Sequence, residues 1–287
     1  MPDRHTLFFL HGMGDTHPID GFSTLWSAIG EAYDHKGDNA VGDFEQRYRR
    51  GFIDWHKVTE AAKLTVFDDA FSPMQPQHTL PGELLHPVAA ARTFMTYFLG
   101  DVTAYVSEND NNIRVSVWTE MQKSLELGGP YSLVAHSLGS VIAFDFVFNL
   151  FVKQQLFAPV NTRFGNVDVA DLRRRFRGLY TMGAPIGLFM LRKGELWKPG
   201  DPSRNGGPAF STIKNPLSSP DHSWLNFWDK QDVIAYPLEG LFATNAAYNA
   251  GRPLQDSEVS TGLEPISAHL GYWKCADVAA EIAHDLA

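Results

Sequence analysis

Three polar residues occur in the order and the local settings that serine-based nucleophilic catalysis needs. Ser137 lies at the centre of the pentapeptide Ala-His-Ser-Leu-Gly, Asp232 follows a late apolar run, and His269 precedes the final amphipathic segment. A serine hydroxyl is a weak nucleophile at neutral pH. It needs an imidazole to take its proton and an acid to orient that imidazole. The order serine, acid, histidine therefore predicts acyl transfer through a Ser-His-Asp triad.

The setting of Ser137 predicts a nucleophile elbow. The apolar run 131–135 leads into the serine, and Val141 and Phe144 follow it at helical spacing. A strand, a tight turn and a helix with the serine at the apex push the hydroxyl out of the turn. Ala135 stands where the usual Gly-x-Ser-x-Gly pattern has its first glycine. The strand and the helix nearly touch beside the serine, so the position requires a small residue, and alanine is small.

The upstream half of an oxyanion hole is predicted at the end of the first strand. The apolar residues 6–10 are interpreted as a central parallel strand, and a glycine-containing loop follows them. The backbone N–H groups of Met13 and Leu138 are predicted to bind the developing oxyanion. An ordinary strand-to-helix turn is the alternative reading of this loop. The candidate substrate-binding residues around these amides are His11, Gly12 and His136.

Two aspartates compete for the role of the acid. Asp232 precedes the apolar pair Val-Ile, which is the commoner placement, and it is favoured. Asp229 lies directly at the end of a predicted strand, where it could cap the turn, and it is the alternative acid.

Four other histidines compete with His269 for the role of the base. His136 adjoins the serine, but neighbouring side chains in a tight turn diverge, so it is expected to pack or bind elsewhere. His11 is expected to be a structural hydrogen-bonding residue of the upstream loop. His222 is expected in a cap, and His284 on an exposed face of the last helix. His269 is preferred because it lies in a predicted loop before that helix.

Apolar runs and helical periodicity alternate along the chain, which predicts an α/β protein with a mostly parallel central sheet and helices on both faces. The predicted strands are 6–10, 64–67, 131–135, 178–185 and 224–228. The predicted helices are 22–34, 88–106, 113–125, 168–176, the segment after the serine and a final helix to about 286. Residues 71–87 and 239–262 are predicted loops. Residues 186–222 are interpreted as a cap inserted into a single domain of residues 1–287.

Composition restricts the classes of function. The formal net charge of −9 argues against a nucleic-acid partner. The single cysteine, Cys275, excludes an intrachain disulfide and a cysteine metal site, and no His-Glu-x-x-His spacing indicates a metal hydrolase. The start of the chain has no signal-peptide pattern, and no apolar run is long enough to span a bilayer. A cytoplasmic location without an integral membrane segment is therefore expected.

The motifs resemble those of the α/β-hydrolase superfamily, in its lipase and esterase branch. The resemblance rests on Leu-His-Gly-Met-Gly at 10–14, on the pentapeptide around Ser137, and on the late Asp232 and His269. It follows the order of elements over nearly the whole chain. The resemblance implies an α/β-hydrolase fold with the nucleophile, acid and base at these positions.

A narrower similarity is to intracellular phospholipase A1-like hydrolases. It is carried by residues 136–142 together with 232–238. Those enzymes usually have glycine where Ala135 stands and proline where Val233 stands, so the chain departs from their pattern at two positions.

The resemblance implies a serine hydrolase that cleaves small-molecule or lipid carboxylic esters through an acyl-enzyme and needs no cofactor. The aromatic residues of the expected cap favour an apolar acyl or alcohol group. Two other readings stay open: a lipase or phospholipase that acts at a lipid surface, and a non-catalytic binding protein of the same fold. Peptidases and acyltransferases share the triad, because a fold does not fix a function. The sequence specifies neither the natural ester nor the oligomeric state.

Overall fold

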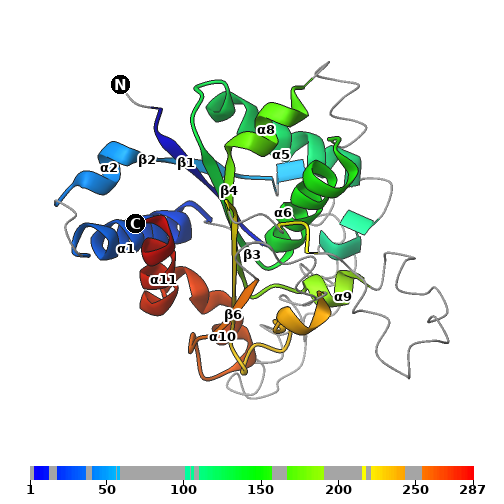
Figure 1. Ribbon diagram of the computed structural model, residues 1–287. Coiled ribbons are helices and arrows are strands. Elements are labelled where there is room, and N and C mark those ends of the chain that lie inside the picture. The colour runs from blue at the N-terminus through cyan, green and yellow to red at the C-terminus, as the bar shows by residue number, and fades with distance from the viewer. Residues whose placement is uncertain are drawn as a thin grey trace, which may run out of the picture.

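A six-stranded, all-parallel β-sheet forms the centre of the protein in a computed structural model (Figure 1). The structure describes residues 3–12, 18–36, 41–55, 57–58, 101–103, 105–106, 110–156, 167–190, 215–217, 221–242 and 254–287. The strands are β1 (His5–Leu10), β2 (Tyr48–Ile53), β3 (Tyr131–His136), β4 (Phe176–Met182), β5 (Ser223–Trp228) and β6 (Gln255–Glu258). Their order across the sheet is β2-β1-β3-β4-β5-β6. The chain is therefore an α/β protein.

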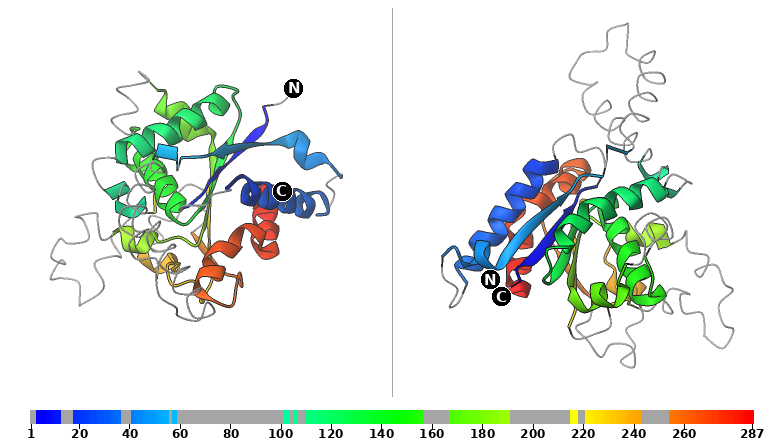
Figure 2. Two further views of the ribbon diagram at one scale, coloured as in Figure 1. Left: turned by 180° about the vertical axis from the view of Figure 1, so that it is seen from behind. Right: turned by 90° about the horizontal axis from the view of Figure 1, so that it is seen from above.

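Helices cover both faces of the sheet (Figures 1 and 2). One face carries α1 (Pro18–Asp34) and α11 (Ala276–Leu286), which pack on each other. The other face carries α5 (Asp110–Leu125), α6 (Leu138–Phe148) and α8 (Val169–Arg175). The shorter elements are α2 (Asp43–Arg47), α9 (Ile186–Met190), α10 (Pro265–Leu270), the π-helix η2 (Asn149–Lys153), and the 3-10 helices η5 (Glu239–Leu241) and η6 (Gly271–Lys274).

The strand residues alternate between two hydrophobic cores. On β1, Phe8 and Leu10 pack into the core that α5 and α6 cover. Leu7 and Phe9 point the other way, into the core that α1 and α11 cover. A parallel strand that is buried on both faces reads as a continuous apolar run, which is why residues 6–10 predict β1 correctly.

The predicted strands at 6–10, 131–135, 178–185 and 224–228 correspond to β1, β3, β4 and β5. The predicted helices at 22–34, 113–125, 168–176 and the end of the chain correspond to α1, α5, α8 and α11. The predicted strand 64–67, the loop 71–87 and most of the predicted helix 88–106 lie outside the described residues, as does most of the interpreted cap 186–222. Within the cap range, residues 186–190 form α9.

Two strands differ from the expectations. The predicted strands include none at 48–53, yet these residues form β2, which pairs with β1 from Tyr48 opposite His5. Arg49 donates from Nε to Thr6 Oγ1 at 2.7 Å within that pair. The predicted loop 239–262 contains η5 and the edge strand β6. Both strands lack the apolar signal of a central strand, because edge strands need little of it.

The helices of the described residues include none with both the length and the apolar character needed to cross a bilayer.

Candidate active site

Three polar side chains meet at the edge of the sheet where the strands end. Ser137 directly follows β3, and Asp232 lies in the turn after β5. His269 lies on the short helix α10, not in the loop that the sequence predicted for it. In open α/β sheets, ligands bind outside the carboxyl ends of the strands. The topology therefore brings residues from distant parts of the sequence to the edge at which sites form.

The three side chains form one hydrogen-bonded chain. His269 Nδ1 lies 2.8 Å from Asp232 Oδ2, and His269 Nε2 lies 2.8 Å from Ser137 Oγ. All three residues are buried. A carboxylate that accepts from Nδ1–H leaves the Nε2 lone pair to accept the serine proton. This arrangement can activate a hydroxyl nucleophile and return its proton to a leaving group.

The backbone of Ser137 is strained. Its φ of 53° and ψ of −129° lie where residues with side chains rarely occur. The serine ends β3 and immediately precedes α6, so the turn holds Oγ at its apex. Leu138 is the first residue of that helix, and the leading amides of a helix favour developing negative charge. Met13, the other predicted oxyanion donor, lies outside the described residues.

Two glycines allow the elbow to fit against the end of β1. A Cβ atom on Gly12 would lie 2.3 Å from Ser137 Cβ and 2.9 Å from Ser137 Oγ. A Cβ on Gly139 would lie 2.4 Å from the carbonyl oxygen of His11. Real Cβ atoms do not approach so closely, so these two positions require glycine. Ala135, at the departure from the usual pattern, is fully buried and pairs in register with Leu10.

Asp232 is held by more than the histidine. The Ile234 N–H donates to Oδ1 at 3.0 Å, and the Tyr272 hydroxyl donates to Oδ2 at 3.1 Å. Burial by itself raises the pKa of Asp232. The hydrogen bond and charge of His269, with the Ile234 amide, outweigh burial and hold the pKa below its ordinary value. Asp232 is therefore ionised at neutral pH, as the partner of an imidazolium should be.

Asp229 has a different set of partners. Its Oδ1 accepts from the Gln231 N–H at 2.8 Å, and its Oδ2 accepts from the Thr261 N–H at 2.6 Å, with the Thr261 hydroxyl oxygen 2.9 Å away. The carboxylate therefore caps its own turn and ties it to the segment that leads into α10. The structure brings Asp232, and not the alternative acid Asp229, to His269.

His11 supports the upstream loop. Its Nδ1 donates to the Gly12 carbonyl at 2.8 Å, and its ring stacks on Trp55 with centroids 5.2 Å apart. The Trp55 indole N–H donates to the His11 carbonyl at 2.9 Å, and His11 Nε2 lies 3.4 Å from Asp54 Oδ1. The ring is fully buried. The structure thus gives His11 the structural hydrogen-bonding contacts expected of it.

His136 remains in contact with the other site residues. Its ring is buried, its Nε2 lies 2.6 Å from the His269 carbonyl oxygen, and the two rings lie 4.8 Å apart. Sequence reasoning expected this side chain to pack or bind elsewhere. The turn instead directs it toward the backbone of the histidine that contacts Ser137.

Two of the rival histidines, His222 and His284, lie apart from the three residues. His222 is not in a cap: it directly precedes β5 at the opposite edge of the sheet, where it contacts Phe151 and Phe176. His284 is exposed on α11, as expected, and contacts Lys36.

Tyr272 and Gly183 are site residues that sequence reasoning missed. The Tyr272 hydroxyl joins Asp232 to the backbone N–H of Asp229, which donates to it at 2.9 Å. Gly183 has a φ of 56°, and a Cβ there would lie 2.9 Å from the Tyr272 ring and 3.1 Å from Asp232 Oδ2. The available signals were the small residues after β4 and the aromatic pair that follows His269.

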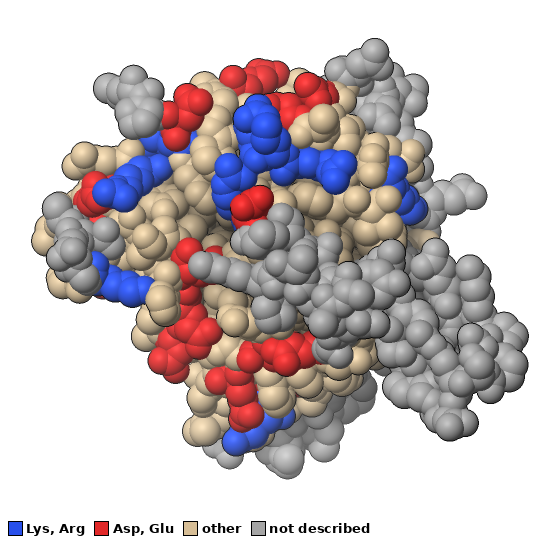
Figure 3. All heavy atoms as spheres, viewed as in Figure 1, with Lys and Arg blue, Asp and Glu red and all other residues tan. Residues whose placement is uncertain are grey.

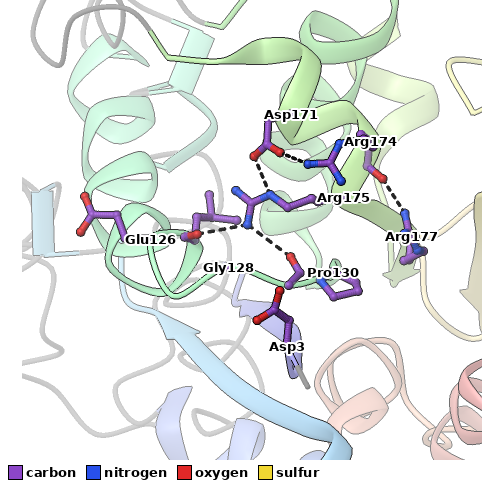
Figure 4. A pocket seen from close by; sticks show the side chains of 10 residues that line it. Asp3, Glu126, Gly128, Pro130, Asp171, Arg174, Arg175 and Arg177 are labelled. Atoms are coloured by element: carbon purple, nitrogen blue, oxygen red, sulfur yellow. Dashed lines mark hydrogen bonds and ion pairs between the residues drawn. The ribbon is translucent and has the colours of Figure 1, made fainter. Parts of the chain in front are cut away.

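A hollow with a volume of about 450 Å³ lies at the opposite edge of the sheet (Figure 4). Arg175 crosses it, donating from Nη1 to the carbonyls of Leu125 at 3.1 Å and Gly129 at 3.2 Å, while its Nε pairs with Asp171 at 2.7 Å. Arginine and acidic side chains are interspersed over this region (Figure 3). The described residues that line this hollow include no serine, cysteine or histidine, so it has no counterpart of Ser137 and His269.

No group of three or more His, Cys, Asp or Glu side chains suited to a metal ion occurs among the described residues. The sequence matches no protein-family model, and none of the curated proteins compared with it is significantly similar.

Proposed function

We propose that the protein is a serine hydrolase of the α/β-hydrolase fold that cleaves carboxylic esters. The observation that carries the proposal is the buried chain from Ser137 through His269 to Asp232, with 2.8 Å at each link. The strained serine at the end of β3 supports the same reading, because a nucleophile elbow requires it.

In the proposed reaction, Ser137 Oγ attacks the ester carbonyl carbon while His269 Nε2 takes the hydroxyl proton. The carbonyl oxygen becomes an oxyanion, which the amides of Leu138 and Met13 are proposed to hold. The tetrahedral intermediate then expels the alcohol, which takes the proton from His269. Water repeats these steps on the acyl-enzyme and releases the acid. Asp232 orients the imidazole and stabilises its charged form throughout.

A fluorophosphonate probe tests this proposal directly, because it reacts with an activated serine and not with an ordinary one. The wild-type protein should be labelled and should hydrolyse a panel of p-nitrophenyl esters, and Ser137→Ala should do neither. A wild-type protein that resists labelling, or a Ser137→Ala variant that labels equally well, would leave the non-catalytic binding protein as the better reading.

The second candidate function is hydrolysis at a lipid surface. The observation that favours it is the exposure of apolar residues beside two members of the proposed triad: Val233, which follows Asp232, is 66% exposed, and Leu270, which follows His269, is 50% exposed. Contiguous exposed apolar surface next to a site favours contact with an apolar partner, and these two side chains could contribute to such a surface. A lipase or phospholipase should prefer emulsified long-chain esters, whereas a soluble esterase should prefer short-chain esters below their solubility limit.

A further inference from the structure

The proposed triad has a neighbour with no role in the scheme above. We infer that His136 is a positioning residue: its imidazole holds the backbone of His269, and so keeps the base in line between Ser137 and Asp232. This inference rests on the proposed function, and it adds a second histidine to the site.

The contact has the geometry of a short hydrogen bond. His136 Nε2 lies 2.6 Å from the His269 carbonyl oxygen. A carbonyl only accepts, so the His136 proton must be on Nε2. Only 3% of His136 is exposed, so no water competes for the bond.

The His136 ring is uncharged at neutral pH. Burial, with the charge of His269, lowers its pKa to about 3. A neutral N–H donor can hold the His269 backbone without placing a second positive charge beside the imidazolium that would form on His269. The ionisable groups that affect it are His269, Asp232 and His11.

His269 needs such an anchor because α10 is short. The helix has six residues, and His269 is the fifth of them. Short helices depend on tertiary contacts for their stability. The carbonyl of the preceding residue, Ala268, accepts from the Thr261 hydroxyl at 2.6 Å, and the His269 carbonyl accepts from His136. These two hydrogen bonds hold the consecutive carbonyl groups of Ala268 and His269 in α10.

The anchor also links the base to the nucleophile through one strand. His136 is the last residue of β3, and Ser137 is the next residue in the chain. Any movement of the strand end therefore carries both Ser137 Oγ and the backbone of His269 with it. Gly183 leaves room for this contact, because a Cβ there would lie 3.3 Å from His136 Nε2.

The decisive comparison is between variants that keep or remove the donor. His136→Phe keeps a ring and loses the N–H, whereas His136→Gln keeps an N–H near the position of Nε2. We expect His136→Phe to lower kcat for a p-nitrophenyl ester about 10- to 100-fold with KM within about twofold, because misplaced catalytic groups cost rate. If His136→Phe lowers kcat 100-fold, the kcat of His136→Gln should be at least tenfold higher than that of His136→Phe.

His222→Phe is the matched control. His222 is also a buried histidine among aromatic rings, but it lies at the opposite edge of the sheet. The His222→Phe variant should change the melting temperature without changing kcat. If His136→Phe lowers the melting temperature and leaves kcat at the wild-type value, His136 is a packing residue and the inference fails.

A readout that does not depend on turnover separates this inference from the proposed function. The Nδ1 proton of His269, shared with Asp232, should give a low-field proton resonance. That resonance should broaden or move upfield in His136→Phe and be restored in His136→Gln, even if the wild type hydrolyses no ester. An unchanged resonance in the Phe variant would overturn the inference. Should the Phe variant fail to fold, His136→Met against His136→Gln makes the same comparison without a ring.

Discussion

Gly12 and Ser137 approach each other so closely that no side chain fits between them: a Cβ on Gly12 would lie 2.3 Å from that of Ser137. The backbone of Gly12, just after β1, thus packs directly against Ser137. Such an approach is possible only because β1 and β3 are neighbours in the sheet, with Leu10 opposite Ala135.

The first prediction is that Gly12→Ala inactivates the site. The added methyl group must displace either the serine or the upstream loop, and a shift of about 1 Å near reacting atoms can cost 100-fold in rate. We therefore expect kcat/KM for a p-nitrophenyl ester to fall at least 100-fold. Gly240→Ala is the control, because a Cβ at Gly240 has nothing within 4 Å. Equal activity of the two variants would contradict the packing described for the elbow.

The second prediction distinguishes the two aspartates. Asp232→Asn should lower kcat about 10³- to 10⁴-fold, because an amide stabilises the wrong tautomer of the histidine. Asp229→Asn should keep kcat within about fivefold. It should nevertheless lower the free energy of unfolding by about 1–3 kcal/mol, since an amide cannot accept from all of Gln231 and Thr261. Ester hydrolysis and urea unfolding measured on both variants check this. The reverse pattern would make Asp229 the acid.

The third prediction concerns the hydroxyl of Tyr272. Tyr272→Phe removes a donor to Asp232 and leaves the Asp229 N–H without its acceptor. We expect kcat to fall about tenfold and stability to fall by about 1–2 kcal/mol. Thermal unfolding followed alongside ester hydrolysis checks both numbers. Wild-type values of both would mean that the hydroxyl supports neither aspartate.

The fourth prediction is a loss of stability in mild acid. Burial, helped by the charge of Arg177, lowers the pKa of His5 from 6.5 to about 3, and burial lowers that of His136 similarly. Between about pH 3 and pH 6.5, the two histidines bind protons in the unfolded chain but not in the folded chain. Stability should therefore be greatest above pH 6.5 and fall as the pH drops toward 3.

Urea unfolding at a series of pH values measures this dependence. His5→Gln removes one titrating group while keeping a polar partner for Ser132, whose Oγ lies 3.0 Å from His5 Nε2. The variant should have a slope of stability against pH that is shallower by up to about 1.4 kcal/mol per pH unit. An unchanged slope would mean that His5 already titrates normally in the folded protein.

The sequence predicted the parts of the fold that have strong local patterns. Buried parallel strands such as β1 and β3 are continuous apolar runs, and helices such as α1 repeat their apolar residues every three or four positions. β2 and β6 have neither signal: β2 contains Arg49 and Arg50, and β6 reads Gln-Asp-Ser-Glu. They form because the neighbouring strand offers hydrogen bonds, which no local pattern records.

The same distinction applies to the site. Ser137, Asp232 and His269 could be proposed from the order of motifs, and the structure brings their side chains together. The contacts of His136 and Tyr272 could not be predicted, because they depend on where α10 and η6 dock against the sheet. Motifs reveal residues whose identity is restricted locally, whereas supporting residues are restricted by tertiary contacts.

The parallel sheet also determines when the site can exist during folding. His269 and Ser137 are separated by 132 positions in the chain, and their hydrogen bond closes only when both ends of that span have docked. Proteins dominated by such distant contacts fold slowly. The entropy of the long intervening chain is lost before the stabilising contacts form. Regain of the proposed esterase activity after dilution from urea should thus coincide with the last kinetic phase of refolding. Hydrolysis would then report the moment at which the whole sheet has formed.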